Sequence, residues 1–520
     1  MLEVSAVAPF VAGGDGAGLA ALPGEKKSYR PDIDGLRSVA VLSVVLYHLN
    51  KAWVPGGYVG VDIFFVISGF LITRNIWGEM VTGRFSLANF YLRRIRRIAP
   101  AFLVMTIVTV STGTVLLLPN DLLSLAKSAL WGGVSLSNVY FWRHLDTSYF
   151  AESSDQVPLL HTWSLGVEEQ FYFIWPTLLL LALLVPKRRV GALAIAAIIC
   201  VASFVCGELT NVIAQKFSYY MLPARAGELM IGALLALWGA TRTKNLSTPL
   251  RRVWLAETLA TFGVGFVAYS LYMLNDASKF PGVNAIFPCV GAALLMLAGE
   301  FDSRVVKALL TSRPVVFVGL ISYSLYLWHW PVLAFTRYFY GTVESVRAVV
   351  AIIAMLVFSV LSYRYVELPT RHWRGRPIKQ VFALYVAPSA ALCLFAMAIV
   401  STGGFKKQIE SNQSYRDGLA RVEKYTAPAY EFHYNCQLSA FDPSILRATR
   451  CIVGVSTGTG AAEPGMLLWG DSEAAHYIGL IAQIAKRGDF NFRNATHSAC
   501  PPVFGGDYSA APYKAGCDKF

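Results

Sequence analysis

The sequence is poor in charged residues. Aspartate, glutamate, lysine and arginine make up 15% of its 520 residues, whereas a soluble globular domain carries about 25%. Hydrophobic residues make up 55%, and the mean hydropathy is +0.49. These values exclude a soluble single-core domain and indicate a protein that crosses a membrane many times.

Patterns that define several other classes of protein are also missing. No cysteine spacing matches a zinc site or a CxxC redox motif, so we expect no bound metal and no permanent cofactor. Residues 1–28 lack a basic start followed by a continuous apolar core, which predicts a flexible cytoplasmic tail rather than a signal peptide. The absence of an obvious carbohydrate-binding repeat weighs against a glycan sensor or scaffold.

Long apolar runs are abundant. We predict eleven membrane-spanning helices, at residues 36–53, 57–78, 98–118, 168–185, 190–206, 222–240, 253–274, 284–299, 315–333, 345–365 and 379–400. The stretch 121–142 is apolar but interrupted by Lys127, Gly132, Gly133 and Asn138, so we expect an interfacial or re-entrant segment. The predicted fold is an all-α polytopic bundle of about ten helices plus one linking helix, followed by an external, incomplete α/β region.

These elements divide the chain. We expect a cytoplasmic tail at 1–28, a membrane domain at 29–375, a linking helix at 376–401, a periplasmic linker at 402–465 and a last region at 466–520.

The net charge of +13 is distributed along the chain in a way that argues against nucleic-acid binding. Basic residues gather in alternate short loops: Arg93, Arg94, Arg96 and Arg97; Lys187, Arg188 and Arg189; Arg242, Lys244, Arg251 and Arg252; Arg304, Lys307 and Arg313; Arg371, Arg374, Arg376 and Lys379. This is the positive-inside pattern. It predicts a bilayer partner, a bacterial inner-membrane location, a cytoplasmic N-terminus and an external C-terminal region.

The cysteines agree with that topology. Cys436, Cys451, Cys500 and Cys517 all lie in the predicted external region, where disulfides form. Four cysteines allow three pairings, and we favour the local one, Cys436–Cys451 with Cys500–Cys517.

Two ionisable residues lie within the first predicted span. Arg37 and His48 are eleven residues apart, which puts them within roughly 20° of one helix face and ~16 Å apart along the axis. Such residues in a membrane indicate function. His48 is a candidate general base, or an imidazole bonded to its neighbours. Arg37 could hold the donor or an acidic group, or reach to the headgroups. Asp62 could fix the tautomer of His48 or lie at the interface.

Several blocks resemble one family. Asp34-Gly35-Leu36-Arg37, the ten-residue gap to His48 and the run GVDIFFVISGFLIT are similar to acyltransferase family 3 membrane proteins, whose best-known members are O-antigen and peptidoglycan O-acetylases. Further blocks follow in family order over about residues 30–375: Phe90–Pro100, His161–Leu165, Glu168–Tyr172, Arg225–Leu229, Ser322–Pro331 and Glu367–Pro369.

The resemblance implies an activity and a donor. It implies an O-acyltransferase that uses acyl-CoA, most often acetyl-CoA, with His48 as the base. It also implies that the cluster Arg93, Arg94, Arg96 and Arg97 contributes to the CoA site, where arginines suit phosphates. Anchoring at the inner headgroups is the alternative for this cluster.

Other polar residues are candidates for binding the acceptor. His161, Trp163, Glu168 and Glu169 fall at the external start of the fourth predicted span, where they suit a saccharide or simply form an interfacial belt. Arg225 and Glu228 share a helix face and could bind substrate or neutralise each other. His329 could pack against its neighbours or belong to the functional site.

The C-terminal region carries a second motif. Met466–Trp469 reads as a buried strand, followed by Gly470-Asp471-Ser472 and a helix to Lys486, which resembles the nucleophile turn of SGNH hydrolases, with Ser472 as nucleophile. No DxxH follows Ser472, so we expect a truncated or decayed domain without a full triad, in which Ser472 is an acyl carrier only in a complete protein.

The sequence thus favours transfer of an acyl group from cytoplasmic acyl-CoA to a hydroxyl of a cell-surface polysaccharide such as lipopolysaccharide O-antigen. The saccharide acceptor could be free or lipid-linked. The alternative is a transporter or flippase without acyl transfer.

Overall fold

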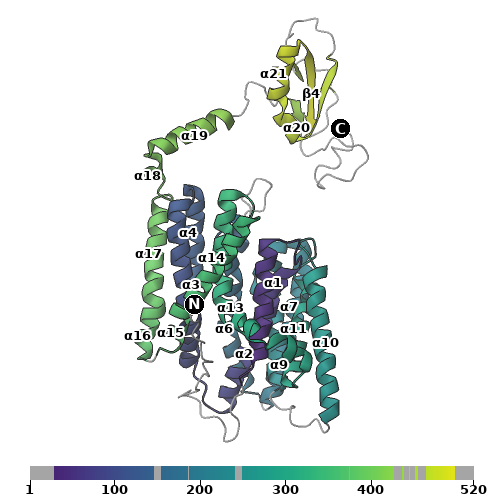
Figure 1. Cartoon of the computed structure of the whole chain (residues 1–520), viewed down its shortest axis with the longest axis vertical. Helices are drawn as coiled ribbons and strands as arrows, with labels where there is room; N and C mark the ends of the chain where they lie inside the picture. Colours follow the sequence, from purple (N-terminus) through teal and green to yellow (C-terminus); the bar gives the residue numbers. More distant parts are fainter. Residues whose placement is uncertain are drawn as a thin grey trace, which may run out of the picture. The chain divides into compact units, whose positions relative to one another are not determined.

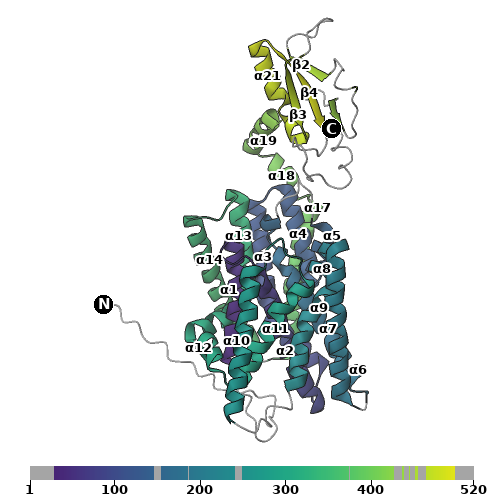
Figure 2. The same ribbon diagram turned by 90° about the vertical axis from the view of Figure 1, so that its right-hand side faces the viewer.

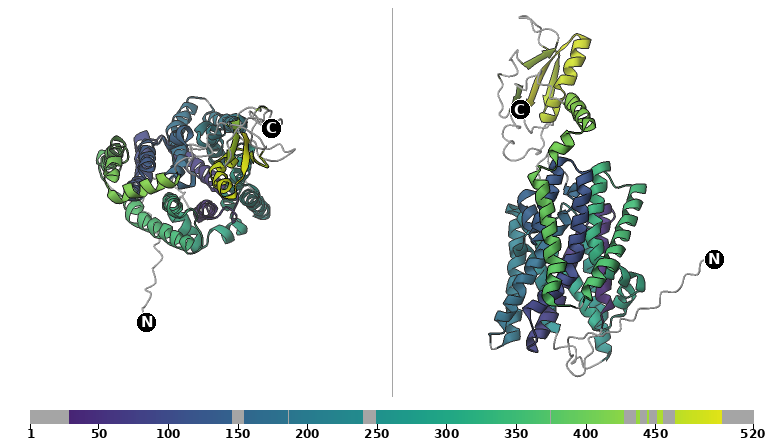
Figure 3. Two further views of the ribbon diagram at one scale, coloured as in Figure 1. Left: turned by 90° about the horizontal axis from the view of Figure 1, so that it is seen from above. Right: turned by 90° about the vertical axis from the view of Figure 1, so that its left-hand side faces the viewer.

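The computed structural model describes residues 29–145, 154–185, 187–239, 249–373, 375–426, 436–438, 444, 451–454 and 464–497. The chain divides into two compact units, Met1–Lys407 and Gln408–Phe520. In the first unit the long helices run alongside one another (Figures 1 and 2), and they are seen end-on in Figure 3. The predicted tail at 1–28 lies outside the described residues.

The first unit is helical throughout its described part. Its long helices are α1 (Pro31–Leu49), α2 (Gly60–Val81), α3 (Leu87–Leu116), α4 (Pro119–Gly133), α6 (Trp163–Ala182), α7 (Arg188–Ile213), α9 (Leu222–Gly239), α10 (Pro249–Met273), α11 (Ile286–Glu300), α13 (Arg313–Tyr340), α14 (Val346–Ser362) and α17 (Ala387–Ser401). The shorter pieces are η1 (Gly57–Val59), α5 (Ser137–His144), η2 (Ser154–Gln156), η3 (Leu160–Thr162), α8 (Gln215–Tyr220), η4 (Gly282–Ala285), α12 (Arg304–Leu310), η5 (Tyr363–Glu367), α15 (Leu368–Arg371), α16 (Pro377–Val381), η6 (Phe382–Val386) and α18 (Lys406–Glu410), which reaches the second unit.

The predicted multi-pass helical bundle is confirmed. Within the described residues, nine helical segments are long and apolar enough to cross a membrane, and each overlaps a predicted span. The two remaining predicted spans are helical as well, as α1 and α6, but charged side chains within both lower their hydropathy.

Two of the predicted helix starts that differ from the structure change the interpretation of the site. Helix α3 begins at Leu87, where the Ser86 side chain accepts a hydrogen bond from the Asn89 N–H, rather than at residue 98. The arginines at 93–97 therefore lie on a helix and not in a loop. Helix α6 begins at Trp163 rather than at 168, so Glu168 and Glu169 lie inside the helix and not at its start. Hydropathy missed both helix starts because polar residues inside each helix, Arg93–Arg97 in α3 and Glu168–Gln170 in α6, lower the local average.

Two helices fill the stretch predicted to be interfacial or re-entrant. α4 has 15 residues and α5 has 8, and each is shorter than the ~20 residues that a crossing requires. Ser135, with a φ of 62°, lies in the turn between them. α4 packs along α17, as Figure 1 shows. Whether these helices are interfacial or re-entrant stays a prediction.

The segment that contains α2 is the most buried of the nine candidate membrane spans. In the segment Gly57–Val81, 72% of the residues in the apolar stretch are buried. The corresponding share is 22% in each of the helical segments Val346–Arg371 and Pro377–Ser401. Close packing against α9 requires glycine at two places, because a Cβ on Gly69 would lie 1.9 Å from the Leu229 carbonyl oxygen and one on Gly232 would lie 2.0 Å from that of Val66. Gly69 therefore lies at a close helix-packing contact, which holds α2 firmly against α9.

The second unit contains helix α19 (Gln413–Thr426) and a small α/β region. Its strands are β1 (Gln437–Leu438), β2 (Ile452–Gly454), β3 (Met466–Gly470) and β4 (Asn491–His497), with helices α20 (Ser472–His476) and α21 (Ile478–Gly488). β4 pairs in parallel with β3 and β1 and antiparallel with β2. The predicted Cys436–Cys451 disulfide is present, whereas Cys500 and Cys517 lie outside the described residues.

Candidate active site

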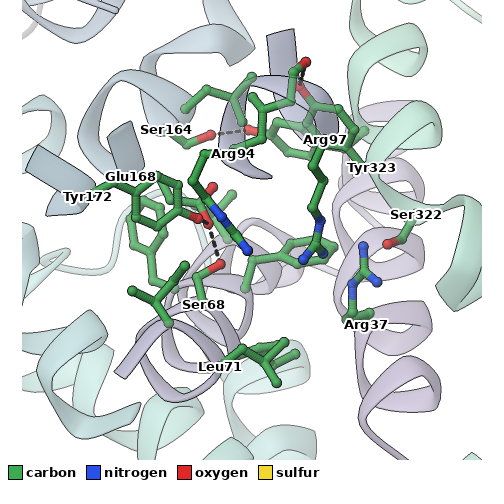
Figure 4. A pocket seen from close by; sticks show the side chains of 18 residues that line it. Arg37, Ser68, Leu71, Arg94, Arg97, Ser164, Glu168, Tyr172, Ser322 and Tyr323 are labelled. Atoms are coloured by element: carbon green, nitrogen blue, oxygen red, sulfur yellow. Dashed lines mark hydrogen bonds between the residues drawn. The ribbon is translucent and has the colours of Figure 1, made fainter. Parts of the chain in front are cut away.

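Three arginines converge on a cavity inside the bundle, which we call the arginine cavity. Its volume is about 90 Å³, and it is bounded by α1, α2, α3, α6 and α13. Figure 4 shows the guanidinium groups of Arg37, Arg94 and Arg97 turned toward this space. The remaining walls combine apolar side chains with one carboxylate and several serine and tyrosine hydroxyls, so these cations face a cavity with few anionic groups.

The arginine cluster of α3 splits into two pairs. Arg94 and Arg97 line the cavity. Arg93 instead binds both carboxylate oxygens of Glu79 at 2.9 Å, and Arg96 Nε donates to Gln380 Oε1 at 2.6 Å. The sequence-based expectation of four arginines at one site is therefore corrected to two, because helical geometry turns the other two toward neighbouring helices.

Arg37 reaches the same cavity from α1. Its Nη1 lies 3.3 Å from Asp34 Oδ1, and Tyr29 donates a hydrogen bond of 2.8 Å to the other oxygen of Asp34. Burial and this hydrogen bond raise the pKa of Tyr29 to about 12, so the phenol keeps its proton. Arg37 is 9% exposed, which places it in the bundle rather than at the headgroups.

Glu168 is the carboxylate of the arginine cavity. It accepts hydrogen bonds from Ser68 of α2 and Tyr172 of α6. Glu169, the next residue, accepts a hydrogen bond from Ser135 and lines two further cavities beside Tyr385, one of which Arg94 also lines. The two glutamates were expected together at an external saccharide site; the structure separates them and gives Glu168 to the cavity that holds the arginines.

A second and larger cavity, which we call the histidine cavity, has a volume of about 280 Å³. Its walls combine polar groups with aromatic faces: His48, His161, His329, Trp163, Trp330, Tyr47, Tyr58, Tyr219, Tyr220, Phe280, Lys51, Asp155, Asn275 and Asp276 are among them. Asp276 accepts a hydrogen bond from Tyr47 and forms a 2.7 Å ion pair with Lys51. Aromatic rings with carboxylate and amide groups suit the apolar faces and hydroxyls of a sugar.

Three imidazoles stand together in this cavity. The ring centroid of His329 lies 5.6 Å from that of His48 and 5.7 Å from that of His161. Because a carbonyl oxygen can only accept, the 2.6 Å contact between His329 Nδ1 and the Tyr326 oxygen places a hydrogen on Nδ1. In the neutral ring, Nε2 is then the basic nitrogen. Among the described residues, no group of histidine, cysteine, aspartate or glutamate has the geometry of a metal site.

The two cavities meet. Of the described lining residues, Val61 and Tyr326 are common to both. Helices α1 and α13 run in the same direction, with Arg37 and Ser322 at the arginine cavity and His48 and His329 at the histidine cavity. The shared face predicted for Arg37 and His48 therefore opens onto one cavity at each end.

Asp62 has a different partner from the one expected. It was expected to fix the tautomer of His48, but its Oδ1 lies 3.4 Å from Arg225 Nη2, and Arg225 Nη1 lies 2.9 Å from Glu228 Oε1. All three side chains are at most 1% exposed and line neither the arginine cavity nor the histidine cavity. Arg225 and Glu228 thus form an ion pair with each other, which is the alternative given above, and they lie outside the arginine and histidine cavities.

Aromatic rings surround Arg225. Its guanidinium carbon lies 5.4 Å from the ring centroids of Trp163 and Phe280 and 5.8 Å from that of Tyr219. These three rings line the histidine cavity. The buried triad of Asp62, Arg225 and Glu228 therefore packs, through Arg225, against aromatic side chains that line that cavity.

The second unit presents the expected strand–GDS–helix backbone. β3 ends at Gly470, Asp471 caps α20 by accepting a 2.9 Å hydrogen bond from the Glu473 N–H, and Ser472 is the first helical residue. The side chain of Ser472 lies outside the described part of the chain.

Comparisons with known proteins assign both units. Residues 30–364 match the model of an acyltransferase domain family, and residues 435–520 match an SGNH domain of the kind fused to such domains. The chain belongs to this acyltransferase family. The match covers the helices that carry Arg37, His48, Arg94, Arg97 and His329.

Individual relatives agree with the family. The chain is 31% identical over 404 residues to "Putative O-acetyltransferase SAR0937" of Staphylococcus aureus MRSA252, a match covering 74% of this chain and 65% of that protein. It is 34% identical over 361 residues to "Putative peptidoglycan O-acetyltransferase YrhL" of Bacillus subtilis 168, covering 66% and 55%. It is 30% identical over 356 residues to "O-acetyltransferase OatA" of S. aureus NCTC 8325, covering 66% and 57%.

The chain thus spans less than two thirds of the length of these curated relatives. No solved structure matches it.

Sequence reasoning missed Tyr326 and Val61, which line both cavities. Tyr326 lies within the Ser322–Pro331 block, but an aromatic residue in a membrane helix has no feature that separates a lining residue from a packing one. Sequence reasoning also missed Ser68, whose hydroxyl donates a hydrogen bond to Glu168.

Proposed function

We propose that this chain is a membrane O-acyltransferase that moves an acetyl group from acetyl-CoA to a hydroxyl of a cell-surface saccharide. The observation that carries the proposal is the pair of cavities that share Val61 and Tyr326, one lined by arginines and the other by histidines and aromatic rings. Acetyl-CoA approaches through the arginine cavity, where Arg94 and Arg97 bind its anionic groups. The saccharide enters the histidine cavity.

The proposed chemistry is a single acyl transfer. His48 takes the proton of the attacking hydroxyl, the hydroxyl oxygen forms a bond to the thioester carbonyl carbon, and the carbon–sulfur bond breaks. The departing thiolate receives the proton. Arg37 keeps the donor aligned from the other end of the same helix face. The SGNH unit would then carry the acetyl group onward through Ser472.

Charge and disulfide placement support one orientation in a bacterial inner membrane. Basic residues of the chain gather near Arg93, Lys187, Arg313 and Arg371, and positive ends face the cytoplasm. The Cys436–Cys451 disulfide suits an oxidising compartment for the second unit. Acetyl-CoA, which is cytoplasmic, would then enter at the end where the arginines lie.

The acceptor is proposed to be a polysaccharide such as lipopolysaccharide O-antigen, free or lipid-linked, and peptidoglycan, named for one relative, is the competing acceptor. The test supplies radiolabelled acetyl-CoA to the purified chain in lipid with each glycan in turn. We expect ester-linked label on one glycan and an equal release of CoA thiol. Movement of a glycan across the membrane without thiol release would support the flippase alternative instead.

A further inference from the structure

A single aromatic side chain stands where the arginine and histidine cavities meet. Tyr326 of α13 lines both, and Val61 of α2 is the other described residue that does so. The two side chains come from different helices and flank the same junction. They are the two described residues at the boundary between the arginine and histidine cavities.

The position of Tyr326 is fixed by contacts at both of its ends. Its hydroxyl lies 2.6 Å from Ser164 Oγ and donates to the His161 carbonyl oxygen at 3.0 Å. Its own carbonyl accepts the 2.6 Å hydrogen bond from His329 Nδ1. The side chain is 7% exposed, so the ring has little room to turn.

The contents of the two cavities explain why a barrier between them would matter. The histidine cavity is polar and holds about 280 Å³, far more than the ~15 Å³ that one water molecule requires. Water that reached a thioester in the arginine cavity would form a carbon–oxygen bond, break the carbon–sulfur bond and give its proton to the thiolate. The products would be free acid and CoA thiol, without transfer to a saccharide.

We propose that Tyr326, opposed by Val61, is the specificity-determining partition of this protein. It admits an acetyl group to the histidine side, rejects longer acyl chains and keeps water from the thioester. This inference rests on the proposed function. Because a pocket separates substrates by about tenfold or more per methylene, wild type should prefer acetyl-CoA over propionyl-CoA by about tenfold.

The experiment compares Tyr326→Phe, Tyr326→Ala and Val61→Ala with wild type, each as the full chain in lipid. CoA thiol release is measured from acetyl-, propionyl- and butyryl-CoA, with and without purified O-antigen or peptidoglycan glycan. We expect Tyr326→Ala to lose most of the preference for acetyl-CoA and to gain thiol release without acceptor. Val61→Ala should change both in the same direction, whereas Tyr326→Phe keeps the ring and therefore the preference.

The outcomes separate this inference from the proposed function. Wild type that releases no thiol from any of the three donors overturns both. Active wild type together with unchanged acyl preference and unchanged acceptor-free release in Tyr326→Ala overturns the partition alone. If Tyr326→Ala does not fold, an unchanged preference in Val61→Ala overturns it equally.

Discussion

The imidazole rings of His48 and His329 stack, with their centroids 5.6 Å apart and their planes 29° from parallel. His48 lies in the last turn of α1, and its carbonyl accepts a hydrogen bond from Arg337 of α13. His329 lies mid-way along α13 with its Nδ1 bonded to the Tyr326 carbonyl. Both rings line the same cavity. Replacing each histidine in turn therefore shows which of them accepts the proton in acyl transfer.

His48→Ala should lower CoA thiol release from acetyl-CoA by about 10²- to 10⁴-fold, because a general base contributes an effect of that size. His329→Ala should lower it less, since the ring then supports His48 without taking the proton. The measurement is acceptor-dependent thiol release by each variant in lipid. Full release by His48→Ala together with loss in His329→Ala would assign the base to His329 instead.

The four arginines of α3 should separate into two functional pairs. Arg94→Ala and Arg97→Ala should each raise the KM for acetyl-CoA by about 10- to 100-fold, the effect of losing a hydrogen bond to a charged group. Arg93→Ala and Arg96→Ala are the matched controls, because these side chains contact Glu79 and Gln380 outside the cavity. Steady-state kinetics on all four variants is the check, and equal KM changes across the set would refute the division.

Removing the cation of the buried triad should destabilise the protein. Arg225→Met leaves Asp62 and Glu228 buried without a countercharge, which costs about 3–5 kcal/mol. The control is Lys307→Met, whose ion pair with Asp302 is on the surface and is worth less than about 1 kcal/mol. Thermal unfolding in detergent compares the two variants. A midpoint for Arg225→Met that matches wild type would show that the triad does not hold the bundle together.

The contact between α2 and α9 should tolerate no side chain at Gly69. A Cβ there would lie 1.9 Å from the Leu229 carbonyl oxygen, so Gly69→Ala should cost about 1–3 kcal/mol through overpacking. Gly78→Ala lies on the same helix with nothing within 4 Å of the new Cβ, which makes it the control. The yield of monodisperse protein and its unfolding temperature are the readouts. Similar values for the two variants would rule out the close contact.

Much of the bundle could be predicted from the sequence, because apolar runs of membrane length leave few structural alternatives. The shared face of Arg37 and His48 followed from helical periodicity alone, and the structure gives that face a cavity at each end. The GDS turn before Ser472 was visible because strand, turn and helix lie next to one another in the chain.

The rest depended on contacts between distant segments. The partner of Asp62 is Arg225, more than 160 residues away, and no local pattern predicts that pairing. Arg93 and Arg94 are neighbours in sequence but point to Glu79 and to the cavity, because successive helical residues are turned by about 100°. Hydropathy also placed Glu168 at a helix end, since polar residues inside a helix lower the same average that marks its boundary.

The central claim is that the acyl group passes from the arginine cavity to the histidine cavity within one chain. Proteoliposomes of uniform orientation test it directly, with radiolabelled acetyl-CoA confined to the side of the arginine cavity and purified O-antigen or peptidoglycan glycan confined to the other. We predict labelled glycan on the far side from wild type and none from His48→Ala. Label on glycan only when donor and acceptor share one compartment would contradict the account.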